Sequence, residues 1–207
     1  TMSAPEHDDF WAQKRRQILQ RLHAASPQTA QAEPPAALYA DLYAQPAHSR
    51  PREVFATQFT ALGGYYIEVA NAAELAIALQ QFVAENACTP VFCASPTLQN
   101  LLPAEALAPS LRQATAALTD CTALIAQHGS ILISALVTRA ASALPDWHIV
   151  VAQEAQICPT LGEALALVQP DESSMHSIIS GASRTADIEK TLVMGAHGPK
   201  KICVFLV

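Results

Sequence analysis

Glycine and charge are both scarce in this chain. Only 7 of its 207 residues are glycine and 14% are charged, whereas 51% are hydrophobic. Disordered chains have the opposite composition, and this length suffices for one substantial core, so we expect a folded protein. The formal net charge of −6 disfavours nucleic acid or an anionic membrane surface as the main partner, because both repel an acidic protein.

Signals for a membrane span, a secretory leader and a bound metal are missing as well. No run approaches the roughly 18 apolar residues that a bilayer requires, and the first residues lack the basic and apolar regions of a signal peptide. The five cysteines are odd in number and form no C-x-x-C pair, and neither H-E-x-x-H nor a glycine-rich phosphate-binding motif occurs. These absences predict a cytoplasmic protein with no membrane insertion, no metal and no other cofactor.

The first 51 residues differ in composition from the remainder. Residues 8–24 carry apolar side chains near helical spacing with basic residues among them, which predicts an amphipathic helix. Residues 24–51 are rich in proline, alanine and glutamine, which predicts an extended arm that lies across the domain or a neighbouring subunit of a homo-oligomer. We therefore expect a helix and a proline-rich arm over residues 1–51 and an α/β domain over residues 52–207.

Strand-like and helix-like segments alternate within residues 52–207. Apolar runs predict strands at 65–69, 90–94, 130–137, 148–152, 175–180 and 201–207, and helical spacing and capping residues predict helices near 54–62 and at 71–86, 96–102, 160–168 and 185–194. The apolar stretch 118–125 fits neither pattern. This alternation predicts an α/β fold, a mainly parallel sheet with helices on both faces. Such sheets bind ligands at the carboxyl ends of their strands, where we expect the turn at 180–185.

The few glycines gather near the end of the chain, and they mark a candidate ligand site. Three of the seven, Gly181 among them, lie between residues 180 and 198. Ser183, Arg184 and Thr185 open the predicted helix 185–194, and a helix N-terminus beside an arginine suits a carboxylate or a phosphate. The alternative is a capping motif, in which Ser183 or Thr185 caps the helix and Arg184 pairs with a nearby acid.

Two further segments hold candidate ligand contacts. His197 follows the predicted helix, where it either bonds a terminal carbonyl or contacts a ligand. His128, Gly129 and Ser130 precede a strand, and the backbone N–H groups of Gly129 and Ser130 suit an anion, although a tight polar turn explains them equally well. We predict that Gly129 and Ser130 face the turn at Ser183. His148 is expected to be a hydrogen-bonded histidine at a strand start.

The candidate turn also carries a family resemblance. The sequence Ser180-Gly181-x-Ser183-Arg184-Thr185-Ala186-Asp187-Ile188-Glu189, followed by Gly195-x-His197-Gly198-Pro199, is similar to the C-terminal signature of LUD-domain proteins, the lactate-utilisation protein C group. Residues 124–131, 145–149 and 159–164 resemble other parts of this family in the same order. The resemblance implies a fold like that of the CoA-transferase and sugar-isomerase superfamily. It also implies a part in the oxidation of L-lactate to pyruvate, together with partner proteins that carry iron–sulfur clusters.

One departure from the family concerns chemistry. The family's Glu-Thr before the glycine is Gln127-His128 here, so a neutral amide replaces a potential general base. Three hypotheses stay open. The chain is an accessory subunit of a lactate-oxidising complex, an acyl- or CoA-transferase-like enzyme with a nucleophile such as Glu68 or Glu154, or a regulatory protein that binds a carboxylate or phosphorylated metabolite. The amide at Gln127 weakens the second hypothesis most, and whether the chain is an enzyme stays open.

Overall fold

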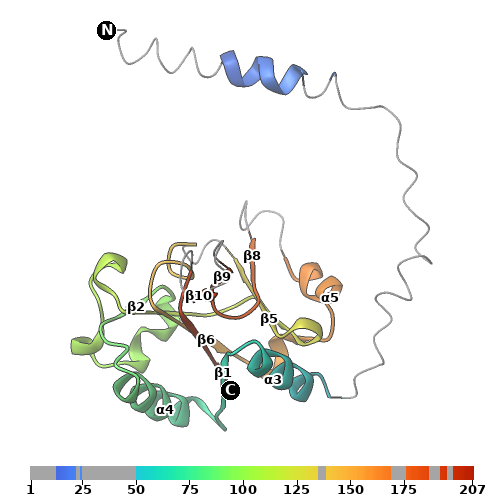
Figure 1. Cartoon of the computed structure of the whole chain (residues 1–207). Helices are drawn as coiled ribbons and strands as arrows, with labels where there is room; N and C mark the ends of the chain where they lie inside the picture. Colours follow the sequence, from blue (N-terminus) through green and yellow to red (C-terminus); the bar gives the residue numbers. More distant parts are fainter. Residues whose placement is uncertain are drawn as a thin grey trace, which may run out of the picture. The chain divides into compact units, whose positions relative to one another are not determined.

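Figure 1 shows a computed structural model of the chain, which describes residues 13–21, 24, 50–134, 139–168, 176–186, 192–194 and 198–207. The chain divides into two compact units, Thr1–Pro46 and Ala47–Val207. In the first unit, residues 13–21 are helical, within the helix predicted over 8–24. The arm predicted over 24–51 lies almost wholly outside the described residues. No described helix has the length and apolar character that crossing a bilayer requires.

A five-stranded parallel sheet forms the centre of the second unit. Its strand order is β1 (Tyr65–Glu68), β11 (Lys201–Leu206), β6 (Trp147–Ala152), β3 (Ala116–Thr119) and β2 (Val91–Cys93), and all neighbouring pairs are parallel. The middle strands are buried on both faces, which explains their near-continuous apolar sequences. The predicted α/β fold with a mainly parallel sheet is confirmed. The unassigned stretch 118–125 holds the end of β3 and the start of the second sheet.

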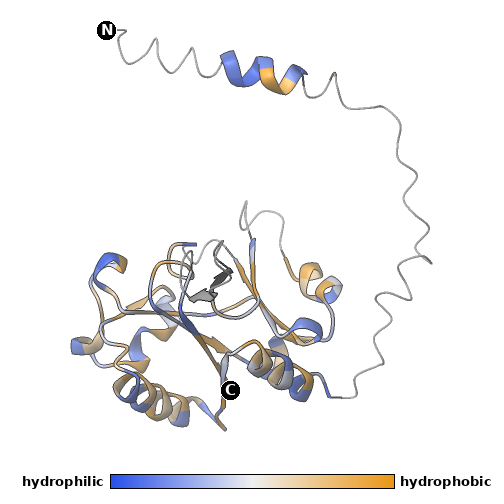
Figure 2. Ribbon diagram, viewed as in Figure 1, coloured by the Kyte–Doolittle hydropathy of each residue, from blue (hydrophilic) through white to orange (hydrophobic). Residues whose placement is uncertain are grey.

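One face of this sheet is covered by α4 (Ala72–Glu85) and by short 3-10 helices. Leu75, Leu79 and Phe82 of α4 pack with Ile149 and Phe205 of the sheet. Figure 2 shows that α4 carries hydrophilic residues as well, as expected for a helix with one solvent-exposed side. The 3-10 helices between β2 and β3 are η1 (Pro96–Leu101), η2 (Ala104–Ala106) and η3 (Leu111–Gln113).

Asn71 caps α4 as the sequence predicted. Its side-chain oxygen accepts hydrogen bonds of 3.0 Å from the N–H groups of Ala73 and Glu74, and Glu74 in turn accepts from the N–H of Ala70. We expect Asn71→Ala to lower the free energy of unfolding by about 1 kcal/mol, because two helix N–H groups lose their acceptor. Urea unfolding measures this loss. Asn100→Ala at an exposed position is the matched control, and an equal loss there would contradict the capping role.

The other face is covered by α3 (Pro51–Ala61) together with a second sheet that the sequence did not predict. This four-stranded sheet has the order β7 (Ile157–Cys158), β4 (Ala123–Ile125), β5 (Ser130–Ser134) and β8 (His176–Ile179). Phe55 and Phe59 of α3 pack with Leu124, Val150 and Val204 between the two sheets. On the outer side of the second sheet lies α5 (Leu161–Ala166), with Thr160 as its N-cap. The remaining 3-10 helices are η4 (Ala126–His128) and η5 (Glu154–Gln156).

The helix predicted over 185–194 is wrong where the structure describes it. Residues Arg184–Ala186 form β9 and residues Leu192–Met194 form β10, which pair antiparallel with Thr185 opposite Val193. Residues 187–191 lie outside the described part of the chain. β-Branched side chains such as Thr185 and Val193 favour strands, and pairing between two short segments overrides a weak helical pattern. The turn before Arg184 therefore leads into a strand, β9.

Candidate functional site

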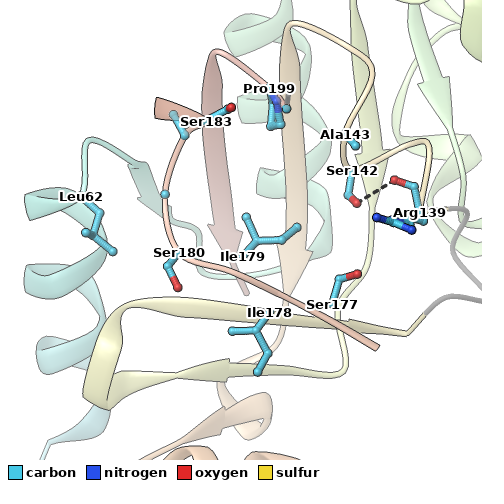
Figure 3. Close-up of a pocket in the computed structure, with 13 residues that line it drawn as sticks. Leu62, Arg139, Ser142, Ala143, Ser177, Ile178, Ile179, Ser180, Ser183 and Pro199 are labelled. Carbon is cyan, nitrogen blue, oxygen red and sulfur yellow. Dashed lines mark hydrogen bonds between the residues drawn. The ribbon is translucent and has the colours of Figure 1, made fainter. Parts of the chain in front are cut away.

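A cavity of about 540 Å3 lies beside the amino-terminal ends of β6 and β11 (Figure 3). Its lining comes from residues 139–143 before β6, 177–183 along and after β8, and 198–199 before β11, together with Leu62. The N–H of Ser183 donates to the carbonyl of Pro199 at 2.9 Å, which holds the turn against the start of β11. The sequence predicted that the turn at 180–185 lies at the carboxyl ends of the parallel strands. This prediction is wrong, because the turn follows β8, which belongs to the second sheet.

Hydroxyl groups and one guanidinium make up the polar lining of this cavity. Figure 3 shows Arg139 and Ser142 on one side and Ser180 and Ser183 on the other, with Ile179 between them. None of the described residues that line the cavity is acidic. One cation among neutral hydroxyl groups, with no carboxylate in the described lining, favours a small anion, since the guanidinium binds carboxylates through two parallel hydrogen bonds.

Arg139 is the lining residue that the sequence reasoning missed. Its side chain is exposed, and none of the ion pairs found among the described residues includes it. Its carbonyl accepts a 3.0 Å hydrogen bond from the buried Ser142 hydroxyl, which shapes the turn that carries it. A signal was present in the sequence, because Arg139 is the only lysine or arginine between Arg112 and Arg184.

The structure joins the predicted turn at residue 180 to the segment at residue 130. The buried hydroxyl of Ser130 lies 2.7 Å from that of Ser180, because β5 and β8 are neighbours. Ser180 lines the cavity, whereas Ser130 does not line it and contacts the cavity only through Ser180. Gly181 also lines the cavity and has a φ of +81°, and a Cβ there would lie 3.0 Å from the carbonyl oxygen of Leu62. Glycine therefore lets the turn approach the end of α3.

Other predicted site residues lie elsewhere. Gly129 has a φ of +60°, and a Cβ there would lie 2.4 Å from the backbone nitrogen of Phe59, so this glycine allows η4 to pack on α3. His128 is exposed at the end of η4, and neither residue lines the cavity. For Arg184 and Thr185 the structure describes only the backbone of β9, and His197 lies outside the described residues. Of the predicted site residues, Gly181 and Ser183 line the cavity.

His148 is buried between the two sheets. Its Nε2 lies 2.9 Å from the hydroxyl of Thr119, whereas its Nδ1 has no hydrogen-bond partner among the described residues. The predicted hydrogen-bonded histidine is therefore satisfied at one nitrogen only. Burial lowers the pKa of His148 to about 4, so the ring is neutral near pH 7. A neutral, enclosed imidazole belongs to the packing of the core.

Glu68 and Glu154, the candidate nucleophiles, lie at the carboxyl-terminal edge of the parallel sheet. Both carboxylates flank Arg52 of α3, and neither residue lines the cavity beside Arg139. The two clusters therefore occupy opposite ends of the strands. Among the described residues, no group of three or more histidine, cysteine or acidic side chains is arranged to hold a metal ion.

Comparison with known proteins identifies relatives for much of this domain. The model of the LUD domain family matches residues 101–207, which include all cavity-lining residues except Leu62. The chain is similar to lactate utilization protein C of Deinococcus radiodurans (37% identity over 102 residues, 47% of this chain and 48% of that protein) and of Bacillus subtilis (30% over 103 residues, 46% and 43%). The matches span about half the length of these curated relatives.

A solved structure resembles the fold over a longer stretch. It is the crystal structure of a duf162 family protein from Deinococcus radiodurans, with a TM-score of 0.56 and 23% sequence identity. The similarity covers 79% of this chain and 99% of that chain. This likeness supports the α/β architecture and bears on the fold alone.

Proposed function

The chain belongs to the LUD domain family, and on that premise we propose that it takes part in lactate utilisation as a subunit that binds a small carboxylate beside Arg139. Relatives that match about half of the chain are named lactate utilization protein C, which supports this pathway. L-Lactate and pyruvate are the carboxylates in question. In this proposal electron transfer belongs to partner proteins with iron–sulfur clusters, as the family resemblance implies, and the chain itself is an accessory subunit.

The observation that carries the proposal is the lining of the cavity. Arg139 supplies the positive charge, and the hydroxyl groups of Ser142, Ser180 and Ser183 give the rest of the lining a polar, uncharged character. L-Lactate presents a carboxylate and a hydroxyl on adjacent carbons, so one guanidinium and a nearby serine match both groups. The absence of acidic residues from the described lining leaves no repulsion to overcome.

The volume of the cavity widens the range of ligands to test. About 540 Å3 falls within the usual range for small-molecule sites and exceeds what a three-carbon acid fills. A phosphorylated metabolite would also match Arg139 and the serine hydroxyls, because phosphate and carboxylate share the same donors. The binding test therefore includes both classes.

We expect L-lactate or pyruvate to raise the melting temperature of the full chain, because a ligand that binds only the folded state stabilises it. Arg139→Gln should weaken that binding by roughly 30-fold, as expected when a charged hydrogen-bond donor is lost. Thermal-shift titration with L-lactate, pyruvate, phosphorylated metabolites and CoA thioesters measures the effect. Arg112→Gln, at an exposed position away from the cavity, is the matched control.

Two results would contradict the proposed site. One is a thermal shift that survives Arg139→Gln at unchanged affinity, which would move the ligand elsewhere. The other is the absence of any shift while wild type and variant are both folded. That result would favour an accessory subunit that acts through binding its iron–sulfur partners without a ligand of its own.

A further inference from the structure

A charged crevice lies at the carboxyl-terminal edge of the parallel sheet, at the opposite end of the strands from the cavity beside Arg139. It measures about 220 Å3 and is lined by Glu68 and the two residues after it, by the end of β11, by Glu154 and by Arg52. A second hollow of about 370 Å3 shares Arg52 and Glu154 and extends to Arg50 and Glu53. The two hollows share the charged residues Arg52 and Glu154, and the proposed function uses neither hollow.

The topology of the sheet accounts for the position of this crevice. The chain leaves β1 toward α4, which packs on one face of the sheet, and leaves β6 toward η5 and β7, on the other face. The end of β11 lies between these two strands. Connections that diverge to opposite faces open a gap above the carboxyl ends of the strands, and open α/β sheets bind ligands in such gaps.

Arg52 lies between two carboxylates at ion-pair distances that are too long for a hydrogen bond. Its Nε is 3.8 Å from Oε1 of Glu68, and its Nη1 is 3.7 Å from Oε1 of Glu154. Both distances exceed a hydrogen bond, so these contacts leave the guanidinium donors available to a ligand. The side chains of Arg52 and Glu68 are about half exposed, and that of Glu154 is more exposed. By contrast, Arg50 forms a direct 2.9 Å ion pair with Glu53.

Tyr66 holds Glu68 in place. Its phenol donates a 2.9 Å hydrogen bond to Oε1 of Glu68, and its ring packs edge-on against the buried Phe55. Burial and the neighbouring Glu68 both raise the pKa of the Tyr66 phenol, so the group stays a proton donor. One carboxylate oxygen is thus anchored, and Oε2 of Glu68 is not part of that hydrogen bond.

We propose that this crevice binds a zwitterionic α-amino acid, with its carboxylate on Arg52 and its ammonium group between Glu68 and Glu154. The two carboxylates repel a ligand that carries only a negative charge, and the guanidinium repels a ligand that carries only a positive charge. An α-amino acid carries both charges on one carbon, which matches an arginine less than 4 Å from each glutamate. Solvent screens these exposed charges, so we expect a dissociation constant on the order of 1 mM.

The test is a thermal-shift and calorimetric screen of the full chain. It uses the Arg139→Gln background, in which we expect the other cavity to bind carboxylates more weakly. Each of the common L-amino acids is added at about 10 mM, with acetate and methylammonium as ligands that carry a single charge. We expect at least one amino acid to raise the melting temperature by about 3 °C and both single-charge ligands to have no effect. Arg52→Gln should abolish the shift, and Glu154→Gln should weaken binding about tenfold.

Three results would overturn the amino-acid site. These are no shift with any amino acid, equal shifts with acetate or methylammonium, and a shift that persists in Arg52→Gln. Arg112→Gln controls for the loss of an exposed arginine elsewhere. Loss of lactate binding in Arg139→Gln is read separately from loss of amino-acid binding in Arg52→Gln. A negative result for amino-acid binding beside Arg52 therefore does not contradict carboxylate binding beside Arg139, and the reverse also holds.

Discussion

Lowering the pH from 7 to 4 should destabilise the folded domain by about 3 kcal/mol through His148 alone. The ring is fully buried between the sheets, and burial lowers its pKa from an ordinary 6.5 to about 4. Below pH 6.5 the unfolded chain therefore takes up a proton that the folded protein does not. The free energy of unfolding then falls with pH until the folded-state pKa is reached.

Urea unfolding at a series of pH values tests this expectation. His148→Gln retains a polar side chain near Thr119 but cannot titrate, so its stability should fall less steeply than that of wild type between pH 6.5 and 4. Carboxylates titrate in both proteins, and the difference between the two curves isolates His148. His128→Gln, at an exposed position, controls for the loss of one histidine. Parallel curves for wild type and His148→Gln would show that the imidazole is not held in its neutral form.

Gly129→Ala should lower the free energy of unfolding by about 4 kcal/mol. The φ of +60° is costly for any residue with a Cβ, and the added methyl group would lie 2.4 Å from the backbone nitrogen of Phe59. A backbone atom cannot move aside as a side chain can, so η4 and α3 must separate. Ser130 follows directly and supports Ser180 of the cavity, so ligand binding beside Arg139 should weaken as well.

Gly162→Ala is the matched control for this substitution. Gly162 lies in α5, where an added Cβ would meet nothing closer than the hydroxyl of Thr160 at 3.9 Å. Alanine is the better helix former, so this change should stabilise the domain by up to about 1 kcal/mol. Chemical denaturation of both variants gives the comparison. Similar small effects at both positions would mean that η4 is free to shift away from α3.

Several elements were predictable because their signals are local. The cap of α4 at Asn71 and that of α5 at Thr160 depend on hydrogen bonds within four residues, and both are found as expected. The long apolar run of β11 identifies a strand buried on both faces. The helix expected over 185–194 is wrong at the residues that the structure describes there, because its pattern was weak and the pairing of β9 with β10 prevailed.

The candidate sites were predictable from the sequence only in part. Gly181 and Ser183 were identified from a cluster of small residues that also resembles a family signature, and both line the cavity. Arg139 belongs to no such cluster, and it meets Ser183 at the same cavity only because the chain returns from β8 to the start of β11. The sequence predicted no common site for Glu68 and Glu154. The pairing of β1 and β6 with β11 brings both residues to Arg52.

By itself, the sequence determined the family signature, the capped helices, the buried parallel strands and the small-residue turn around Ser183, since each depends on neighbours a few residues away. Only the tertiary structure decided that a second sheet covers one face of the first, and that the turn lies at the amino-terminal edge. It also decided that Arg139 supplies the charge of one site and Arg52 that of the other. The physical reason is that each site joins segments far apart in the chain, which only strand order and packing bring together.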